Sequence, residues 1–309
     1  VIKARLVDIL EKTKFFSNVQ AAYRKGRNTC DHILVLQEIF LHYRFEKIGP
    51  RGRIGMQILY LCFMDLKKAF DTVPRNLLFA KLEALGLEGK ILNVIKDLYT
   101  SNSACIRIGN KMTESFKIEA GVLQGNKLGP ILFIIYINDL LEQLEESELG
   151  VHIWNIVISA LGFADDIVLV TDKAKNLQSL IDICAEWSKI NGMEFNTDKC
   201  KVMILNGKRT NIYYTLQRKL LEIVKKYKYL GITLSNTRLT SLFTKHVSNV
   251  VEKAEKRVNC IRHFGFTSDG LRPETCIEMY KILVRPILDY AAQVLNYKHH
   301  YFRKVGRLN

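Results

Sequence analysis

The chain has 309 residues, 48% hydrophobic and 25% charged, which excludes a disordered protein and allows two or three subdomains with a sizeable core. No apolar run reaches the ~18 residues of a membrane-spanning helix, so no membrane span is expected. The formal net charge of +15 favours a polyanionic partner, nucleic acid first and a membrane surface second, although a basic surface can also serve solubility alone.

The N-terminal part predicts two helices with a basic turn between them. Apolar residues at helical spacing predict a helix over residues 2–12, and a second amphipathic helix carries its apolar face over residues 33–40. The turn between them, at residues 20–29, could contact phosphates or only be solvated. Its basic residues are Arg24, Lys25 and Arg27. Residues 47–57 are glycine-rich and basic, which predicts a loop.

A buried strand over residues 58–64 ends on Asp65. Pro74 and Gly86 frame a helix from about residue 74 to 85, and Asp71 near its start is explained as a favourable charge at a helix N-terminus. Asp65 has no such explanation. An acid at the end of a buried strand is therefore a candidate functional residue.

The middle of the chain predicts a helix over residues 89–100, then two strands at 105–108 and 116–119 joined by a turn at Gly109-Asn110. A glycine-punctuated loop at 121–130 allows close backbone approach by a ligand, or is a plain helix entry. It leads into an apolar helix from residue 131 to about 144.

Two adjacent acids, Asp165 and Asp166, stand between two apolar, β-branched runs, which predicts a hairpin whose turn presents both carboxylates. At ~4 Å and an effective dielectric constant of ~20 their repulsion is ~4 kcal/mol. A divalent cation would offset it. The alternative is a solvated acidic turn.

Beyond the acids, the pattern predicts a helix over 176–191 and strands at 193–195, 202–205 and 227–234. From about residue 239 the chain is predicted to be helical, with a break near Pro286. The seven cysteines are scattered and lack zinc spacing, which favours reduced thiols in the nucleus and cytoplasm. The opening at Val1 shows no signal peptide and no Met, so we expect a fragment or a processed chain.

Three carboxylates could meet in one sheet if the strand before Asp65 lies beside the hairpin of Asp165 and Asp166. Such a set could hold two Mg²⁺ ions about 3.5–4 Å apart. One ion would activate a hydroxyl and the other would neutralise a triphosphate, while the basic chain would grip template and primer.

Six motifs in order resemble those of reverse transcriptases of non-LTR (LINE-type) retrotransposons. Residues 63–71 (FMDLKKAFD) resemble the first catalytic motif and residues 163–166 (FADD) the [YF]-A-D-D motif. The other four are residues 20–32, similar to Q-x-G-F-R-x-G-R-S-T-x-D-H; 124–133, similar to Q-G-x-x-L-S-P-x-L-F; 227–231 (YKYLG), similar to the primer grip; and 283–288 (LVRPIL), similar to a thumb segment.

The resemblance implies a role for each matching residue. The metal ligands would be Asp65, Asp165, Asp166 and the main-chain carbonyl of Leu66, holding two Mg²⁺ ions, with Mn²⁺ as an alternative. Lys199 would act as the catalytic group that protonates pyrophosphate; its local sequence alone indicates a solvated turn lysine. The nucleotide-binding residues would be Lys68, Ala69, Phe70, Gln124 and Gly125, with Phe70 as a steric gate against a ribose 2′-OH or simply a core residue. Arg24, Arg27, Tyr229, Leu230 and Gly231 would contact nucleic acid.

Several positions depart from the family pattern. Gly129 replaces the serine of L-S-P, and Ala22-Tyr23-Arg24 replaces G-F-R. Residues 1–19 do not match the upstream finger strand, R-P-I-S, whose arginine binds the triphosphate. We expect a core fragment, with the endonuclease and finger segments on a parent polyprotein.

The implied fold is α+β, a right-hand polymerase with fingers, a palm with an antiparallel sheet and helices on one face, and a helical thumb. The segments predicted are partial fingers 1–56, palm 57–72, fingers 73–122, palm 123–215, primer grip 216–237 and thumb 238–309. The implied activity is RNA-directed DNA synthesis from an RNA template, a DNA primer and dNTPs. The alternatives are an inactive relic that only binds nucleic acid and an RNA-dependent RNA polymerase, which Phe70 disfavours.

Overall fold

The computed structural model describes residues 2–45, 47–48, 54–55, 57–100, 102–207, 212–236, 243–265 and 270–292. The chain divides into two compact units. The first contains Val1–Asn28, Leu59–Val202 and Arg209–Ile223; the second contains Thr29–Ile58, Met203–Lys208 and Val224–Asn309. The finger, palm and thumb boundaries stay predictions.

A five-stranded sheet with the order β10-β11-β3-β12-β15 lies mainly in the first unit, and only residues 203–205 of β12 are assigned to the second. The strands are β10 (Ala160–Phe163), β11 (Asp166–Thr171), β3 (Leu59–Met64), β12 (Lys201–Leu205) and β15 (Glu222–Ile223). Every residue of β3 is buried, as its apolar run predicts. β10, β11 and β3 are antiparallel. The edge pair β12–β15 is parallel, so the predicted antiparallel pattern does not reach this edge. The long connection between β12 and β15 allows the two strands to run in the same direction.

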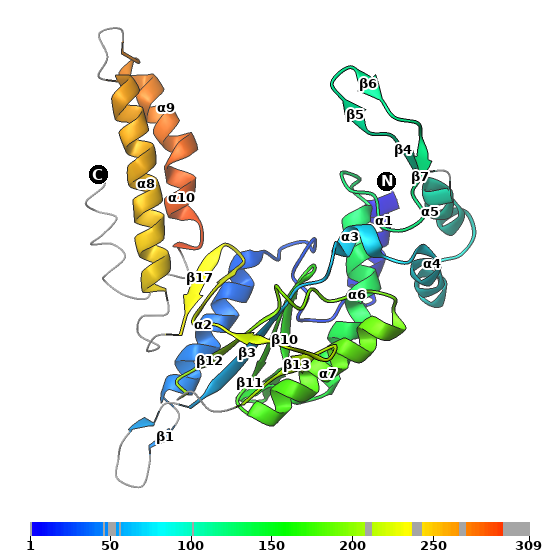
Figure 1. Cartoon of the computed structure of the whole chain (residues 1–309), viewed down its shortest axis with the longest axis horizontal. Helices are drawn as coiled ribbons and strands as arrows, with labels where there is room; N and C mark the ends of the chain where they lie inside the picture. The colour runs from blue at the N-terminus through cyan, green and yellow to red at the C-terminus, as the bar shows by residue number, and fades with distance from the viewer. Residues whose placement is uncertain are drawn as a thin grey trace. The chain divides into compact units, whose positions relative to one another are not determined.

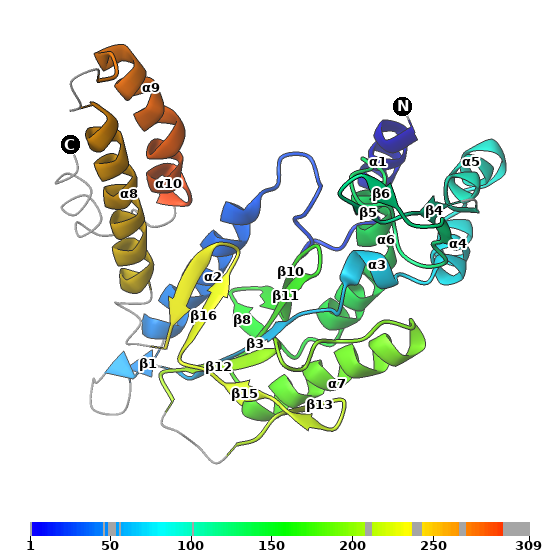
Figure 2. The same ribbon diagram turned by 45° about the horizontal axis from the view of Figure 1, so that its top comes forward.

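Two long helices, α6 (Gly129–Glu146) and α7 (Ala174–Ile190), lie along one face of this sheet (Figure 1, Figure 2). α6 is buried around most of its circumference because it packs against α7, β10 and further helices. The ends of both helices lie within two residues of the predicted ones, and the predicted covering of one face is observed.

Smaller elements complete the first unit. The helices are α1 (Ile2–Lys12), α3 (Ala69–Thr72), α4 (Arg75–Ala84) and α5 (Gly89–Thr100). The hairpins are β8 (Val151–Ile153) with β9 (Ile156–Ile158), and β13 (Thr215–Leu216) with β14 (Lys219–Leu220).

A projecting two-stranded arm corrects one prediction. Its base pairs β4 (Ser103–Ala104) with β7 (Phe116–Lys117), and its tip pairs β5 (Arg107–Ile108) with β6 (Lys111–Met112). The turn at Gly109-Asn110 therefore joins β5 to β6, and the predicted pairing of 105–108 with 116–119 is wrong. A two-residue turn fixes the register of the residues next to it, which here places Ile108 opposite Lys111.

The second unit contains α2 (Thr29–Phe45), the pair β1 (Lys47–Ile48) and β2 (Ile54–Gly55), the hairpin β16 (Lys226–Tyr229) and β17 (Ile232–Ser235), and helices α8 (Thr244–Gly265), α9 (Pro273–Leu283) and α10 (Arg285–Asp289). The last three helices share a core of Val250, Ala254, Ile261, Val284 and Leu288. The chain breaks between α9 and α10 just before Pro286, as predicted. Most of the loop predicted at 47–57 lies outside the described residues.

The single strand predicted over 227–234 is wrong, because the chain reverses at Leu230 and Gly231. Both residues have positive φ, +43° and +79°. Leucine is an unusual residue for such a turn, so the sequence conceals it. Among the described helices, none combines the length and apolar character that crossing a bilayer requires.

Candidate active site at the Asp-Asp turn

The turn between β10 and β11 presents two carboxylates. Phe163 pairs with Asp166, so Ala164 and Asp165 form a two-residue turn, as predicted. Ala164 has φ +57°, a conformation uncommon for alanine. Asp165 is partly buried and Asp166 reaches solvent. The sequence folds this way because the apolar runs on both sides are drawn into the core.

Asp65 lies beside this turn. Met64, the last residue of β3, pairs with Ile167, so the next position brings Asp65 next to Asp166. Residues just before β12 hold the Asp65 backbone: Asn196 N–H donates to the Asp65 carbonyl at 2.7 Å, and Asp65 N–H donates to Cys200 Sγ at 3.3 Å. The predicted neighbourhood of the three acids is confirmed.

Lys199 points at Asp65. Its Nζ lies 3.4 Å from Asp65 Oδ2, and 66% of the lysine side chain is exposed. The contact is an ion pair without hydrogen-bond geometry, since the buried Oδ2 accepts no hydrogen bond from any described residue. The local sequence alone indicates that Lys199 is a solvated turn lysine. In the structure its side chain is exposed and also lies next to a carboxylate.

The carboxylates repel one another. Burial, and then the charge of Asp65, raises the pKa of Asp165, against a hydrogen bond to its own backbone and the charge of Lys199. Loss of solvent contact, followed by the charges of Asp165 and Asp65, raises the pKa of Asp166 to about 6. One lysine does not offset three acids in this space.

These residues fit a divalent cation. Carboxylate oxygens are the donors that Mg²⁺ prefers, and Asp65 Oδ2, which accepts no hydrogen bond from the described residues, is available as a ligand. The bridge between Leu66 and Phe195 uses the Asp65 carbonyl and the Lys67 N–H, and it leaves the Leu66 carbonyl out of those bonds. Within the described residues, no three His, Cys, Asp or Glu side chains form a ready-made metal cage. Side-chain rotation would have to complete the ligand set.

The predicted nucleotide-binding residues gather where α3 meets the glycine-rich loop. Lys68 has φ +45° and Ala69 is buried. The Phe70 ring stacks on Phe133 with centroids 4.6 Å apart. Val122 N–H donates to the Phe70 carbonyl at 2.7 Å, which ties the loop to α3.

Gln124 and Gly125 continue this loop. Asp71 lies in α3 and not in the first turn of α4, so its predicted role at the start of that helix is wrong. Gln124 Nε2 donates to Asp71 Oδ1 at 2.7 Å, so Asp71 holds the loop. A Cβ on Gly121 would lie 2.7 Å from the Asp71 carbonyl oxygen, so only glycine fits there.

Arg24 is held inside the protein. Its guanidinium donates to both oxygens of Glu11 at 2.8 Å and to the carbonyls of Ser17 and Gln20, and only 7% of its side chain is exposed. Four of its five N–H donors are thus used within the protein, which disfavours the predicted phosphate contact by Arg24; that contact stays a prediction. Arg27 donates to the Asn18 carbonyl at 2.6 Å.

A cleft beside the turn supplies other cations. It is lined by α1, residues 23–26 and Lys127, and Lys3, Lys25 and Lys127 are all exposed. Tyr23 lines it as well, and burial followed by the charge of Asp165 raises the pKa of this tyrosine. The cleft therefore adjoins the acidic turn.

The predicted primer-grip residues lie in the second unit, at the β16–β17 turn. Tyr229 is buried, and Leu230 and Gly231 form the turn itself. The Tyr290 hydroxyl donates to the Leu230 carbonyl at 2.7 Å. Tyr290, the residue directly after α10, therefore holds the β16–β17 turn in place.

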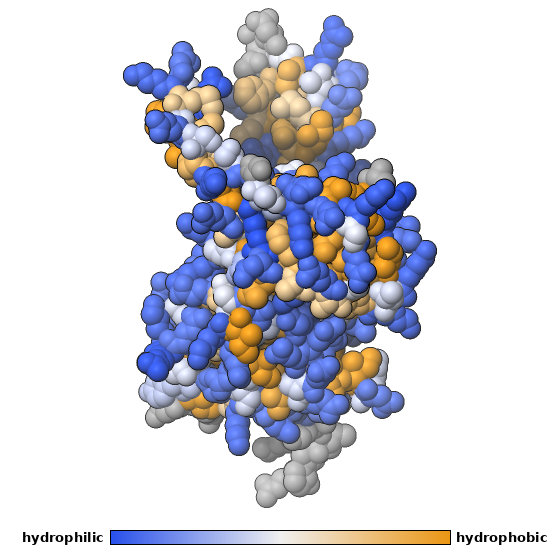
Figure 3. Space-filling view, turned by 90° about the vertical axis from the view of Figure 1, so that its right-hand side faces the viewer, coloured by the Kyte–Doolittle hydropathy of each residue, from blue (hydrophilic) through white to orange (hydrophobic). Residues whose placement is uncertain are grey.

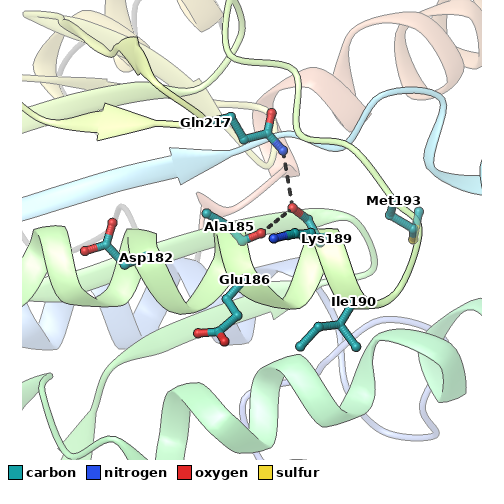
Figure 4. Close-up of a pocket in the computed structure, with 8 residues that line it drawn as sticks. Asp182, Ala185, Glu186, Lys189, Ile190, Met193 and Gln217 are labelled. Carbon is teal, nitrogen blue, oxygen red and sulfur yellow. Dashed lines mark hydrogen bonds between the residues drawn. The ribbon is translucent and has the colours of Figure 1, made fainter.

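A second hollow lies away from the acids, between α7 and the turn of the β13–β14 hairpin (Figure 4). Gln217 Nε2 donates to Ser188 Oγ at 3.2 Å across it. None of the predicted site residues lines this hollow.

The sequence pattern missed two residues that hold the acids. Cys200 contacts the Asp65 backbone, and Gln20 contacts the Asp165 turn. Gln20 is the first residue of a motif that resembles the family's, and Cys200 directly follows Lys199. Their positions beside predicted site residues were the only sequence signal for a role in the site.

Comparison with known proteins gives consistent matches. The family described as reverse transcriptase (RNA-dependent DNA polymerase) matches residues 1–234. The RNA-directed DNA polymerase from mobile element jockey of Drosophila funebris is 29% identical over 301 residues, covering 95% of this chain and 31% of that protein. The Pol polyprotein of the type-2 retrotransposable element R2DM of Drosophila melanogaster is 29% identical over 188 residues, covering 58% of this chain and 18% of that protein. The chain therefore spans about a third or less of these relatives.

Among solved structures, telomerase from Candida tropicalis in complex with the TWJ fragment of telomeric RNA has a TM-score of 0.53 at 15% identity, covering 100% of this chain and 46% of that one. Apo telomerase from the same organism, truncated from its C-terminal domain, has the same TM-score of 0.53 and covers 77% and 44%. This likeness shows the fold alone, and it confirms the right-hand polymerase fold.

Proposed function

Because this chain belongs to the reverse transcriptase (RNA-dependent DNA polymerase) family, and its relatives are non-LTR retrotransposon polymerases, we propose that it extends a DNA primer with dNTPs on an RNA template. The observation that carries the proposal is the meeting of Asp65, Asp165 and Asp166 beside Lys199. A nuclear and cytoplasmic location is part of the same proposal.

Asp65, Asp165, Asp166 and the Leu66 carbonyl would hold two Mg²⁺ ions, or Mn²⁺, which when bound activate the primer hydroxyl and neutralise the triphosphate. Lys199 keeps an exposed ammonium 3.4 Å from Asp65, which suits it to deliver a proton to departing pyrophosphate. Phe70, held by Phe133, would exclude a ribose 2′-OH. Lys25 and Lys127 would take the phosphate contacts first assigned to Arg24.

One observation favours a second candidate, an inactive relic that only binds nucleic acid. In the part of the chain that the structure describes, the acids do not form a ready-made metal cage. The raised pKa values of Asp165 and Asp166 also fit a site that has lost its substrate.

Primer extension on poly(rA)/oligo(dT) with Mg²⁺ separates the two candidates. We expect extension by the wild type and a loss of at least about 100-fold in Asp165→Asn, because charge stabilisation of the reacting phosphate is lost. Template binding, measured by fluorescence anisotropy, should be nearly unchanged. Asp182→Asn, the same change on exposed α7, is the matched control and should extend normally.

Template binding by the wild type without any primer extension would contradict the enzyme proposal and favour the inactive relic. The same assay with ribonucleotides tests the third class, an RNA polymerase. Incorporation of rNTPs as efficiently as dNTPs would contradict the role proposed for Phe70.

A further inference from the structure

The Asp165 turn is held by a residue from a distant part of the chain. Gln20 is completely buried, and its Oε1 accepts hydrogen bonds from Ala164 N–H at 3.0 Å and from Ala22 N–H at 2.9 Å. Ala164 immediately precedes Asp165. One side-chain oxygen thus joins the turn that carries the acids to the segment after α1.

The backbone around Gln20 brings it there. Ala21 N–H donates to the Gly162 carbonyl at 3.0 Å, and Gly162 N–H donates to the Val19 carbonyl at 2.9 Å. These bonds form a parallel bridge between Gln20 and Gly162. Residues 19–21 therefore lie along the edge of β10, joined to it by this single bridge.

The turn needs support of this kind. Ala164 has φ +57°, a left-handed conformation that alanine adopts only when its surroundings impose it. Removal of the Gln20 oxygen would leave two buried N–H groups without a partner. The turn would then relax and move the Asp165 and Asp166 carboxylates.

We propose that Gln20 is a positioning residue for the polymerase site, whose carboxamide oxygen fixes where Asp165 and Asp166 present their ligand oxygens. The proposal rests on the proposed function. Gln20 acts only through Ala164. Its Nε2 has no partner among the described residues, so the oxygen alone should matter.

Three variants isolate that oxygen. Gln20→Met keeps the length and volume and removes the acceptor, whereas Gln20→Glu keeps an acceptor oxygen. Asn138→Leu is the matched control: Asn138 is also a buried carboxamide, and its Oδ1 accepts Ser17 N–H at 2.9 Å without contacting the turn.

The primary readout is Mn²⁺ binding, followed by the electron paramagnetic resonance of the unbound ion. The kcat for dNTP incorporation, the KM for the primer-template poly(rA)/oligo(dT) and the Tm are measured alongside. We expect Gln20→Met to lose about 10–100-fold in Mn²⁺ affinity and in kcat, as for residues that orient metal ligands, with an unchanged KM for primer-template. Gln20→Glu should restore most of both, and Asn138→Leu should lower the Tm alone.

Ala164→Gly gives a second test in case Gln20→Met does not fold. Glycine adopts a left-handed backbone without strain, so the Gln20→Met effect should shrink in the Ala164→Gly background. Wild-type Mn²⁺ affinity in Gln20→Met at a lower Tm would overturn the proposal, as would no Mn²⁺ binding by the wild type. A wild type that binds Mn²⁺ but extends no primer would instead overturn the proposed function and leave Gln20 testable by binding.

Discussion

At the scale of the residue, Asp166 bears the largest electrostatic cost in the site. Loss of solvent contact, and then Asp165 and Asp65, raises its pKa from 3.8 to about 6. The folded protein therefore binds a proton that the unfolded chain has released between these values. Stability from this group is complete below about pH 4 and is lost as the pH rises through about 6.

The substitution Asp166→Asn should therefore stabilise the metal-free protein at pH 7.5 and not at pH 4. We expect a gain of about 1 kcal/mol in the free energy of unfolding, less than the full shift implies because Asp166 reaches solvent. Urea unfolding in EDTA at the two pH values measures it. An equal gain at both would show that the carboxylate charge is not the cause. Added Mg²⁺ should stabilise the wild type more than the variant.

The three acids could be predicted from sequence because each interrupts or ends an apolar run, where a charge needs an explanation. Arg24 and Gln20 could not be assigned in this way. Glu11, the partner of Arg24, lies in α1, and the partner of Gln20 is Ala164, 144 residues away along the chain. Only the folded backbone shows that one is a structural ion pair and the other supports the turn.

At the scale of the element, the β16–β17 turn depends on close packing by one tyrosine. The Tyr290 hydroxyl donates to the Leu230 carbonyl at 2.7 Å, and its oxygen lies 3.2 Å from Thr29 Oγ1, whose own hydroxyl is free to donate to it. A Cβ on Gly231 would lie 3.0 Å from a Tyr290 ring carbon. The turn thus combines left-handed backbone with a tight contact.

The substitution Gly231→Ala should destabilise the protein by more than the about 1–2 kcal/mol that left-handed alanine costs, because the Tyr290 ring must also move. Gly125→Ala is the matched control: its φ is also +79°, and nothing lies within 4 Å of the added Cβ. Thermal unfolding compares the two variants, and adding Tyr290→Ala should reduce the excess for Gly231→Ala. Equal losses in both glycine variants would exclude the ring contact as a cause.

Long helices were predictable because their apolar faces repeat over many turns, as in α6 and α7. Short strands were not. The arm strands β5 and β6 are two residues long and exposed, so no buried face specifies their register. The turn after Tyr229 was concealed by a leucine at positive φ.

At the scale of the whole molecule, the order of six motifs was enough to predict the fold class, whereas the division into two units was not. The second unit gathers three separate stretches, Thr29–Ile58, Met203–Lys208 and Val224–Asn309, which no local pattern joins. The net charge of the whole chain is another property at this scale. The face drawn in Figure 3 is mostly hydrophilic and broken by apolar patches, and the net charge of the chain is +15.

A net charge of this size should make nucleic-acid binding strongly dependent on salt. Neutralising about six phosphates on a duplex would give a slope near −5 for log K against log[KCl], and a loss of about 10³-fold in affinity between 50 and 200 mM. Lys25→Gln and Lys127→Gln, which line the cleft beside the acids, should each make the slope about 0.9 less steep. Lys189→Gln, on the hollow away from the acids, is the control and should leave the slope unchanged. Anisotropy titrations over a series of KCl concentrations measure all four slopes. A flat response in the wild type would rule out phosphate contacts as the source of affinity, and identical slopes for all three variants would rule out the cleft as their location.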